Sequence, residues 1–223
     1  MAQNLPATGP PAEARAEARP ESRSERKHRQ ILDAATSAFL EGGYRGTSMD
    51  EVAATAGVSK QTVYKHFSDK ASLFGEIVRS TVEVAANPVH EEVTRLADTG
   101  DLEADLVDLA RRQLDAVLQA QLLRLRRLVI AEAGRFPELG RMFYDQGAGR
   151  TMRTLAASLA RLSERGLLAV DDAERAAAEL NWLLMAGPVN RAMLLGDDAL
   201  PTRAELDRHA AAAVATFLAA YGR

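Results

Sequence analysis

The chain has 223 residues, of which 47% are hydrophobic and 26% are charged, and its formal net charge at pH 7 is −3. It contains no cysteine, which excludes disulfides and thiolate chemistry and favours a cytoplasmic location. No apolar run approaches the ~20 residues that a membrane-spanning helix needs, and the N-terminus lacks the apolar core of a signal peptide. We therefore expect a soluble protein with no membrane partner.

Residues 1–23 are predicted to form a disordered tail, because they hold four of the eight prolines and few large apolar side chains. Residues 24–41 then predict an amphipathic helix that the glycines at 42 and 43 end. The apolar face of this helix consists of Ile31, Leu32, Ala35 and Phe39.

Residues 47–70 predict two short helices that are joined by a glycine turn and followed by a third helix, which is a helix-turn-helix. Thr47 and Ser48 are good N-caps, and each is followed by an acid three residues later, as in a capping box. Gly57 supplies the residue that can take a positive φ where the first helix stops. Ser59 is then predicted to cap the second helix.

The second of these helices has only two apolar anchors, Val63 and Phe67, so its outward face is polar. No acid lies between Ser59 and Ser68. The polar residues of this face are Lys60, Gln61, Thr62, Tyr64, Lys65 and His66. All of them can donate a hydrogen bond, which is expected of a helix in a DNA major groove, although a solvated amphipathic helix remains the alternative.

The charge distribution agrees with a nucleic-acid partner for this part of the chain. Residues 1–75 carry a formal charge of +1, whereas residues 76–223 carry −4. All four lysines also lie in the first part. Phosphate binding requires this placement of the more basic region.

The string GGYRGTSMDEVAATAGVSKQTVYKHFSDKASLF, residues 42–74, resembles the DNA-binding domain of the TetR family of bacterial transcriptional regulators. The match includes the lead-in GYRGT, the turn AGVS, the ending YKHF and the Lys70 that follows. It covers about residues 25–77, and the rest of the chain is similar to the family only in being helical and of the right length.

The resemblance implies an all-α fold with a helix-turn-helix domain at 24–75 and a helical-bundle domain for ligand binding and dimerisation at 76–223. It implies a homodimer that binds a near-palindromic operator and is released by a small, mostly apolar effector. The residues expected to face bases are Lys60, Gln61, Thr62 and Lys65. Those expected to hold phosphates are Ser48, Tyr64, His66 and Lys70, with Thr47 as a further candidate.

The helix after the helix-turn-helix is predicted to begin after its cap Ser68 and to run toward Val84. Lys70 lies in its first turn, where the helix dipole already favours an anion, so we interpret Lys70 as a phosphate contact. The pair Asn87-Pro88 is expected to bend or end the helix. A hinge at Pro88 that transmits ligand binding is a hypothesis at this stage.

Helical periodicity continues beyond Gly100, without strand-like alternation. The predicted helices cover 101–119, 121–134, a region from 137 to 166 that is interrupted near Gly147 and Gly149, and two longer final segments. Asp171 or Asp172 caps the first of these two, which contains a predicted kink at Gly187-Pro188, and Thr202 caps the second.

The last two helices are predicted to form the subunit interface, because alanines at 176–178 and 210–213 let helices approach closely. The alternative is an ordinary helix pair within one chain. A dimer is favoured because one helix-turn-helix recognises only a half-site.

The middle helices are expected to enclose an effector pocket. The predicted lining residues are Gln113, Met142, Phe143, Tyr144, Trp182, Met185 and Asn190, with His90, Asn181 and Met193 as further candidates. Glu132 is the one acid noted beside an apolar run. The alternative for each bulky residue is a plain core position.

Other classes of function find little support. No catalytic or nucleotide-binding motif is present, and the four histidines share no metal-ligand spacing, so we expect no catalytic residue, metal or cofactor. A helical protein-interaction or ligand-binding module without operator binding is the remaining alternative. Such a module does not require the acid-free donor face of residues 60–66.

Overall fold

The computed structural model describes residues 22–223, in which the regular elements are helices. They are α1 (Arg23–Gly46), α2 (Met49–Thr55), α3 (Lys60–His66), α4 (Lys70–Leu96), α5 (Leu102–Val117), α6 (Ala120–Glu132), α7 (Pro137–Gln146), α8 (Ala148–Glu164), α9 (Ala173–Leu195), the short 3₁₀ helix η1 (Asp197–Ala199) and α10 (Arg203–Tyr221). Extended pairing among the described residues is limited to one bridge between Leu168 and Gly222. The prediction of an all-α fold is confirmed.

The predicted tail, residues 1–23, lies outside the described residues except for its last two. Ser22 caps α1 by accepting a hydrogen bond from the Glu25 N–H, and Arg23 is the first helical residue. The first helix therefore begins one residue earlier than the sequence predicts. It breaks at Gly43, which has φ of 72°, as the two glycines indicated.

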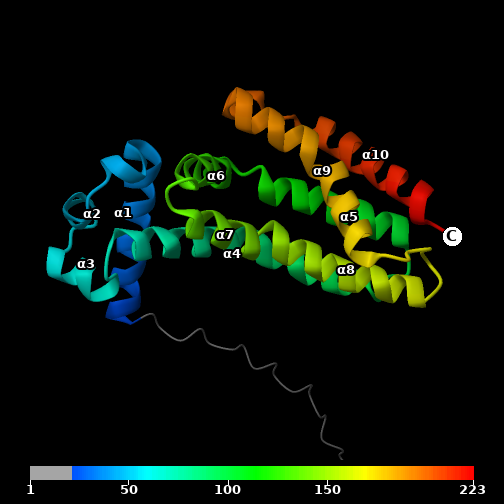
Figure 1. Cartoon of the computed structure of the whole chain (residues 1–223), viewed down its shortest axis with the longest axis horizontal. Helices are drawn as coiled ribbons and strands as arrows, with labels where there is room; N and C mark the ends of the chain where they lie inside the picture. The colour runs from blue at the N-terminus through cyan, green and yellow to red at the C-terminus, as the bar shows by residue number, and fades with distance from the viewer. Residues whose placement is uncertain (1–21) are drawn as a thin grey trace, which may run out of the picture.

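Helices α1, α2 and α3 lie together at one end of the molecule, and α5 to α10 form the body at the other (Figure 1). The long helix α4 leads from α3 into the body, where it packs against α5, α7 and α8. Helices α9 and α10 lie side by side along one edge of the body (Figure 1). The three N-terminal helices are thus connected to the body chiefly by α4, with α6 in contact with α1.

A buried apolar cluster holds the three N-terminal helices together. It contains Ile31 and Phe39 of the predicted apolar face of α1 and the two predicted anchors Val63 and Phe67, together with Tyr44, Met49 and Val52. The ring of Tyr44 stacks on Phe39 at 5.7 Å between centroids and lies 5.0 Å from the ring of Phe74 on α4. Because α3 has only seven residues, this packing and not its own hydrogen bonding keeps it helical.

The predicted caps and turn of the helix-turn-helix are largely confirmed. Ser48 and Glu51 form the capping box of α2, Gly57 has φ of 64°, and the Ser59 hydroxyl accepts the Thr62 N–H. The cap of α4 is different, because Asp69 and not Ser68 accepts the Ser72 N–H at the start of that helix. A carboxylate is the stronger acceptor for the free N–H groups of a helix start, and these bonds lower the pKa of Asp69.

Pro88 does not end α4, which continues to Leu96. Side chains of α8 hold the helix on both sides of the proline: Arg150 donates to Asn87 at 3.0 Å, and Thr154 shares a hydrogen bond of 2.9 Å with His90. One lost backbone hydrogen bond is a small cost for a helix packed along its length. Likewise, α9 continues through Pro188 to Leu195.

The alanines that were predicted to form the subunit interface are divided between the core and the surface. Ala176, Ala177, Ala210 and Ala213 are buried in the core of the body, where α9 and α10 meet the other helices. These four alanines therefore pack within one chain, whereas Ala211 and Ala212 of the predicted set are exposed on α10. Within residues 22–223, no helix combines the length and the apolar character needed to cross a membrane.

We predict that Val63→Ser unfolds the three N-terminal helices, since Val63 is fully buried and one of only two anchors of α3. The loss of apolar burial together with an unpaired hydroxyl is expected to cost about 2–4 kcal/mol. Thermal unfolding followed by circular dichroism measures the effect. Gln61→Ser is the control on the exposed face of α3, and an equal loss of stability in both variants would contradict the assignment.

Candidate DNA-binding surface and internal pocket

The outward face of α3 presents the four side chains that were expected to contact bases, together with Tyr64, which was expected to hold a phosphate. Lys60, Gln61, Tyr64 and Lys65 are exposed, and Thr62 is half-buried. Four of these residues line one shallow surface groove: Gln61, Thr62, Tyr64 and Lys65. Val63 and Phe67 point the other way into the core, so the anchors fix which face of α3 is turned outward.

Lys60 has a partner that the sequence did not reveal. Its ammonium group lies 2.7 Å from a carboxylate oxygen of Asp50 on α2, and both side chains are exposed. The hydrogen bond to Asp50 raises the pKa of Lys60. The face of α3 has no acid of its own, but Asp50 of α2 compensates the charge of Lys60. Asp50 would therefore compete with a DNA phosphate for the Lys60 ammonium group.

Lys70 is also engaged within the chain. Its ammonium group lies 4.6 Å from the centroid of the Tyr44 ring and donates a hydrogen bond of 3.4 Å to the Arg45 carbonyl. Burial lowers the pKa of Lys70. Lys70 is the first residue of α4, so its backbone lies among the free N–H groups at the start of that helix.

His66 is half-buried at the end of α3. Its ring lies 5.6 Å from that of His28 on α1. Burial, followed by the nearby His28, Lys65 and Lys27, lowers the pKa of His66 from its ordinary value and so favours the neutral imidazole. The neutral ring can offer a phosphate one N–H group.

Thr47 and Ser48 have different surroundings. The Thr47 side chain is buried, and its hydroxyl donates to the carbonyls of Ala38 and Gly43 at 2.9 and 3.0 Å. This hydroxyl closes the end of α1, so we remove Thr47 from the set of phosphate contacts. Ser48 is exposed, and its oxygen accepts from the Glu51 N–H, which leaves the hydroxyl proton available.

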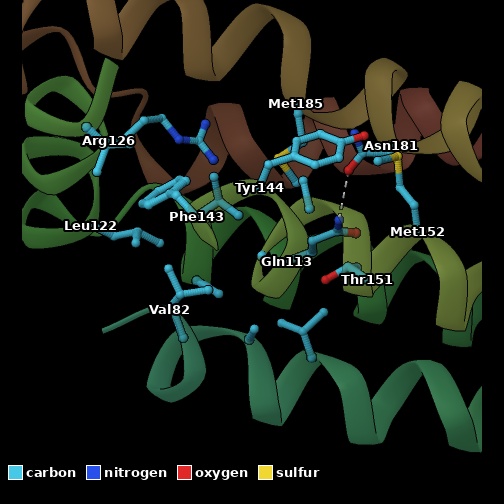
Figure 2. A pocket seen from close by; sticks show the side chains of 18 of the residues that line it. Val82, Gln113, Leu122, Arg126, Phe143, Tyr144, Thr151, Met152, Asn181 and Met185 are labelled. Carbon is cyan, nitrogen blue, oxygen red and sulfur yellow. Dashed lines mark hydrogen bonds between the residues drawn. The ribbon is translucent and has the colours of Figure 1, made fainter. Parts of the chain in front are cut away.

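A second site lies inside the body, where a cavity of about 360 Å³ is enclosed by side chains from α4 to α9. Most lining residues are apolar, and they include Val82, Val89, Val117, Leu122, Val129, Phe143, Met152 and Met185. The polar side chains are Gln113, Arg126, Thr151 and Asn181 (Figure 2). Three exposed apolar residues, Ile130, Tyr144 and Trp182, also line the cavity and mark its accessible side.

Most of the predicted pocket residues are brought together at this cavity. Gln113, Phe143, Tyr144, Trp182 and Met185 line it, and so does Asn181. The side-chain nitrogen Nε2 of Gln113 donates to the side-chain oxygen Oδ1 of Asn181 at 3.3 Å, and both side chains are buried. Two polar groups at positions far apart in the sequence thus satisfy each other in the cavity wall.

Two predicted pocket residues lie elsewhere. Met142 packs against Gly75 of α4. Its terminal methyl lies 3.4 Å from the point where a Cβ would stand if residue 75 were not a glycine. Asn190 is exposed and donates to the Ala186 carbonyl one turn earlier in α9. Their neighbours Phe143 and Met185 point inward because they lie on other faces of α7 and α9. The further candidates His90 and Met193 and the acid Glu132 are also outside the lining.

Arg126 is the pocket residue that sequence reasoning missed. It occupies the apolar face of α6, because Leu122 precedes it by four residues and Val129 follows it by three. An arginine within an apolar stripe at helical spacing was the signal that could have identified it. Among the described residues, no group of three or more His, Asp or Glu side chains is arranged to hold a metal.

Comparison with protein families gives two matches that together cover most of the chain. Residues 31–77 match the family of bacterial regulatory proteins, tetR family. Residues 104–223 match the C-terminal domain of AefR-like transcriptional repressors.

Solved structures agree with these matches. A TetR-family transcriptional regulator from Mesorhizobium loti is 46% identical, with a TM-score of 0.84 over 91% of this chain and 100% of that one. The flavonoid-responsive regulator FrrA is 32% identical, with a TM-score of 0.73 over 88% of this chain and 97% of that one.

Curated relatives match over shorter segments. The transcriptional activator FasR of Mycolicibacterium smegmatis is 35% identical over 33% of this chain and 34% of its own length. The matches to the first three curated relatives span between 25% and 41% of the lengths of those proteins.

We predict that Asp50→Asn strengthens binding to duplex DNA at low salt by about two- to fivefold, because it releases the Lys60 ammonium group from an exposed ion pair. Fluorescence anisotropy with a labelled duplex measures the effect. Asp171→Asn removes the same charge from the exposed loop before α9 and is the control. Unchanged affinity in Asp50→Asn, or equal gains in both variants, would contradict a role for Lys60 at the DNA.

Proposed function

The chain belongs to the TetR family of bacterial transcriptional regulators, and we propose that it is a homodimeric repressor that leaves its operator when a small, mostly apolar molecule enters the body cavity. The observation that carries DNA binding is the outward face of α3. It holds exposed hydrogen-bond donors, has no acid of its own, and is oriented by two buried anchors. This arrangement suits insertion into a major groove.

We assign two kinds of contact to this surface. Gln61, Thr62 and Lys65 face bases, and Lys60 joins them once it separates from Asp50. Phosphates are held by Ser48, Tyr64, His66 and Lys70, which lie at the rim of the helix-turn-helix. Base contacts determine sequence preference, whereas phosphate contacts add affinity that falls with salt.

The dimer is supported by an apolar face of α9 that nothing in the described chain covers. Leu183, Gly187 and Leu194 recur along one side of this helix and are exposed. Alanines at 204, 211, 215 and 219 give α10 an exposed face of small side chains. Pairing these helices with those of a second copy would place two α3 helices on half-sites ~34–36 Å apart in the simplest arrangement.

Control by an effector is supported by residues that serve both sites. Val82, Ala85, Leu122 and Val129 line the cavity and also belong to the apolar cluster that holds the N-terminal helices. A ligand that moves α4 or α6 therefore acts on the packing beneath α3. The relative FrrA is named as flavonoid-responsive, and the C-terminal domain matches a repressor family. The proposal places the protein in the cytoplasm, where bacterial operators are.

Operator binding is tested by titrating the purified protein against its own upstream intergenic DNA, with random DNA as competitor and over a salt series. We predict tight, competitor-resistant binding with a steep salt dependence. Gln61→Ala should relax preference at one base pair, costing about 1–3 kcal/mol there. Tyr64→Phe and Lys70→Ala should weaken binding to all sequences about equally, and Lys70→Ala should also flatten the salt slope.

Two results would contradict this proposal. If the affinity for the intergenic DNA equals the affinity for random DNA, the proposed operator recognition is wrong. Equal effects of the three variants on every DNA sequence would remove the division between base and phosphate contacts. Each variant is checked for unchanged thermal unfolding, so that a loss of binding is not a loss of fold.

We predict that Leu194→Glu weakens dimerisation by at least about tenfold, because it places a charge without a partner in the proposed interface. Leu194 is 81% exposed in the single chain, so the substitution leaves the fold of the subunit intact. Sedimentation equilibrium measures the dimer constant. The control is Val84→Glu on α4, which is 75% exposed and lies outside α9 and α10. A wild-type monomer at micromolar concentration, or equal loss in both variants, would overturn the interface.

A further inference from the structure

One side chain in the cavity wall carries a charge that the described protein does not balance. Arg126 projects from α6 into the cavity, where its guanidinium group lies 5.5 Å from the centroid of the Phe143 ring (Figure 2). It makes no hydrogen bond or ion pair with any residue of 22–223. The lining of the cavity contains no Asp or Glu at all.

The neighbouring arginines of the same helix behave differently. Arg124 and Arg127 both form ion pairs of 2.9 Å with Asp197, and Arg127 also donates to the Ala192 carbonyl. Both arginines thus connect α6 to η1, which follows α9, and Arg127 also connects α6 to α9 itself. The structure thus gives partners to the two arginines that face away from the cavity and none to the one that faces into it.

An arginine held in this way is costly to the free protein. Removing a cation from water without a compensating anion is unfavourable, and a single aromatic ring offsets only part of that cost. The same burial lowers the pKa of Arg126, with no acid acting in the opposite direction. A guanidinium remains charged at every physiological pH, so the cost is relieved only when an anion enters.

We propose that the effector is an amphipathic anion, an apolar body with a carboxylate or phenolate group that pairs with Arg126. This inference rests on the proposed function, because it concerns the molecule that enters the cavity. The aliphatic and aromatic wall takes the body of the ligand. The planar guanidinium offers two parallel N–H groups to the acidic oxygens.

The Gln113–Asn181 pair defines a second polar point of the cavity. Figure 2 shows it apart from Arg126, with Phe143 and Tyr144 of α7 between them in the view. Its unused donor and acceptor groups can bind a hydroxyl or carbonyl on the ligand body. A cationic molecule is disfavoured, since it would face Arg126 without any acid in the wall.

The test uses acids and their uncharged amides as matched probes. Naphthalene-2-carboxylate is compared with naphthalene-2-carboxamide, and decanoate with decanamide, by titration calorimetry of the full-length protein at pH 7.5. We expect each acid to bind at least about tenfold more tightly than its amide, as a charge-assisted hydrogen bond provides. Equal affinities within both pairs, or binding of none of the four probes at millimolar concentration, would overturn the proposal.

Variants of the arginine separate its charge from its shape. Arg126→Met keeps a long apolar side chain and should abolish the preference for the acids, whereas Arg126→Lys should keep part of it. Arg124→Met is the matched control on the same helix, and it should leave the preference unchanged. A preference that survives in Arg126→Met would assign acid binding to another group and contradict the proposal.

A measurement without ligand tests the premise. Arg126→Met should raise the Tm of the ligand-free protein by about 2–4 °C, because it removes a half-buried charge that has no ion-pair partner among the described residues. Arg124→Met should not raise it, since that change breaks an ion pair. A lower Tm for Arg126→Met would show that the free structure depends on Arg126 and would contradict the premise.

The two proposals fail in different ways. If acids bind through Arg126 but none releases the protein from its operator, the ligand class stands and effector control fails. If uncharged apolar molecules release the operator and acids have no advantage, effector control stands and the assignment of an anionic ligand fails.

Discussion

The proposed recognition of DNA depends on α3, a helix that is too short to be stable without its packing partners. With seven residues, α3 is far below the length at which an isolated helix is stable in water, so its shape and orientation come from the two side chains that it buries. Val63 and Phe67 anchor it in a cluster that also contains Phe39 and Phe74. The six remaining residues of α3, 60–62 and 64–66, are therefore free to be polar, and together they form its outward surface.

That cluster does not stop at the N-terminal helices. It extends through α4 to Leu122 and Val129 of α6 and to Leu139 of α7, and the ring of Tyr44 lies 4.8 Å from that of Phe136 at the start of α7. Because the wall of the cavity and the support of α3 share residues, a displacement of the wall by the effector that we propose would reach α3 through packed side chains. A closely packed interior transmits such displacements and does not absorb them. The long helix α4 is continuous through Pro88, so one uninterrupted helix connects the N-terminal helices to the cavity wall.

Local features were predictable from the sequence because their causes lie within a few residues. The capping box at Ser48, the positive φ at Gly57 and the starts of α5, α9 and α10 follow from neighbouring side chains and backbone. Features that depend on contacts between helices were not predictable. The ion pair between Lys60 and Asp50 joins two helices whose crossing the sequence does not specify.

The same reason explains the errors at the two sites. Burial of Thr47 depends on where α1 ends relative to α2, and the exclusion of Asn190 from the cavity depends on the rotation of α9. Arg126 was visible as a charge in an apolar stripe, but only the assembled cavity shows that no acid faces it. Sequence patterns therefore identified the helix-turn-helix in detail, whereas for the ligand site they identified most of the lining residues but not the charged one.

The most direct test of the account is a DNase footprint on the intergenic DNA upstream of the gene, in the presence of excess random DNA. A dimer that presents two α3 helices should protect one short segment with two symmetric half-sites, and Val63→Ser should leave that segment unprotected. Uniform weak protection along the fragment, or a pattern that does not depend on α3, would contradict the central claim that this surface recognises an operator.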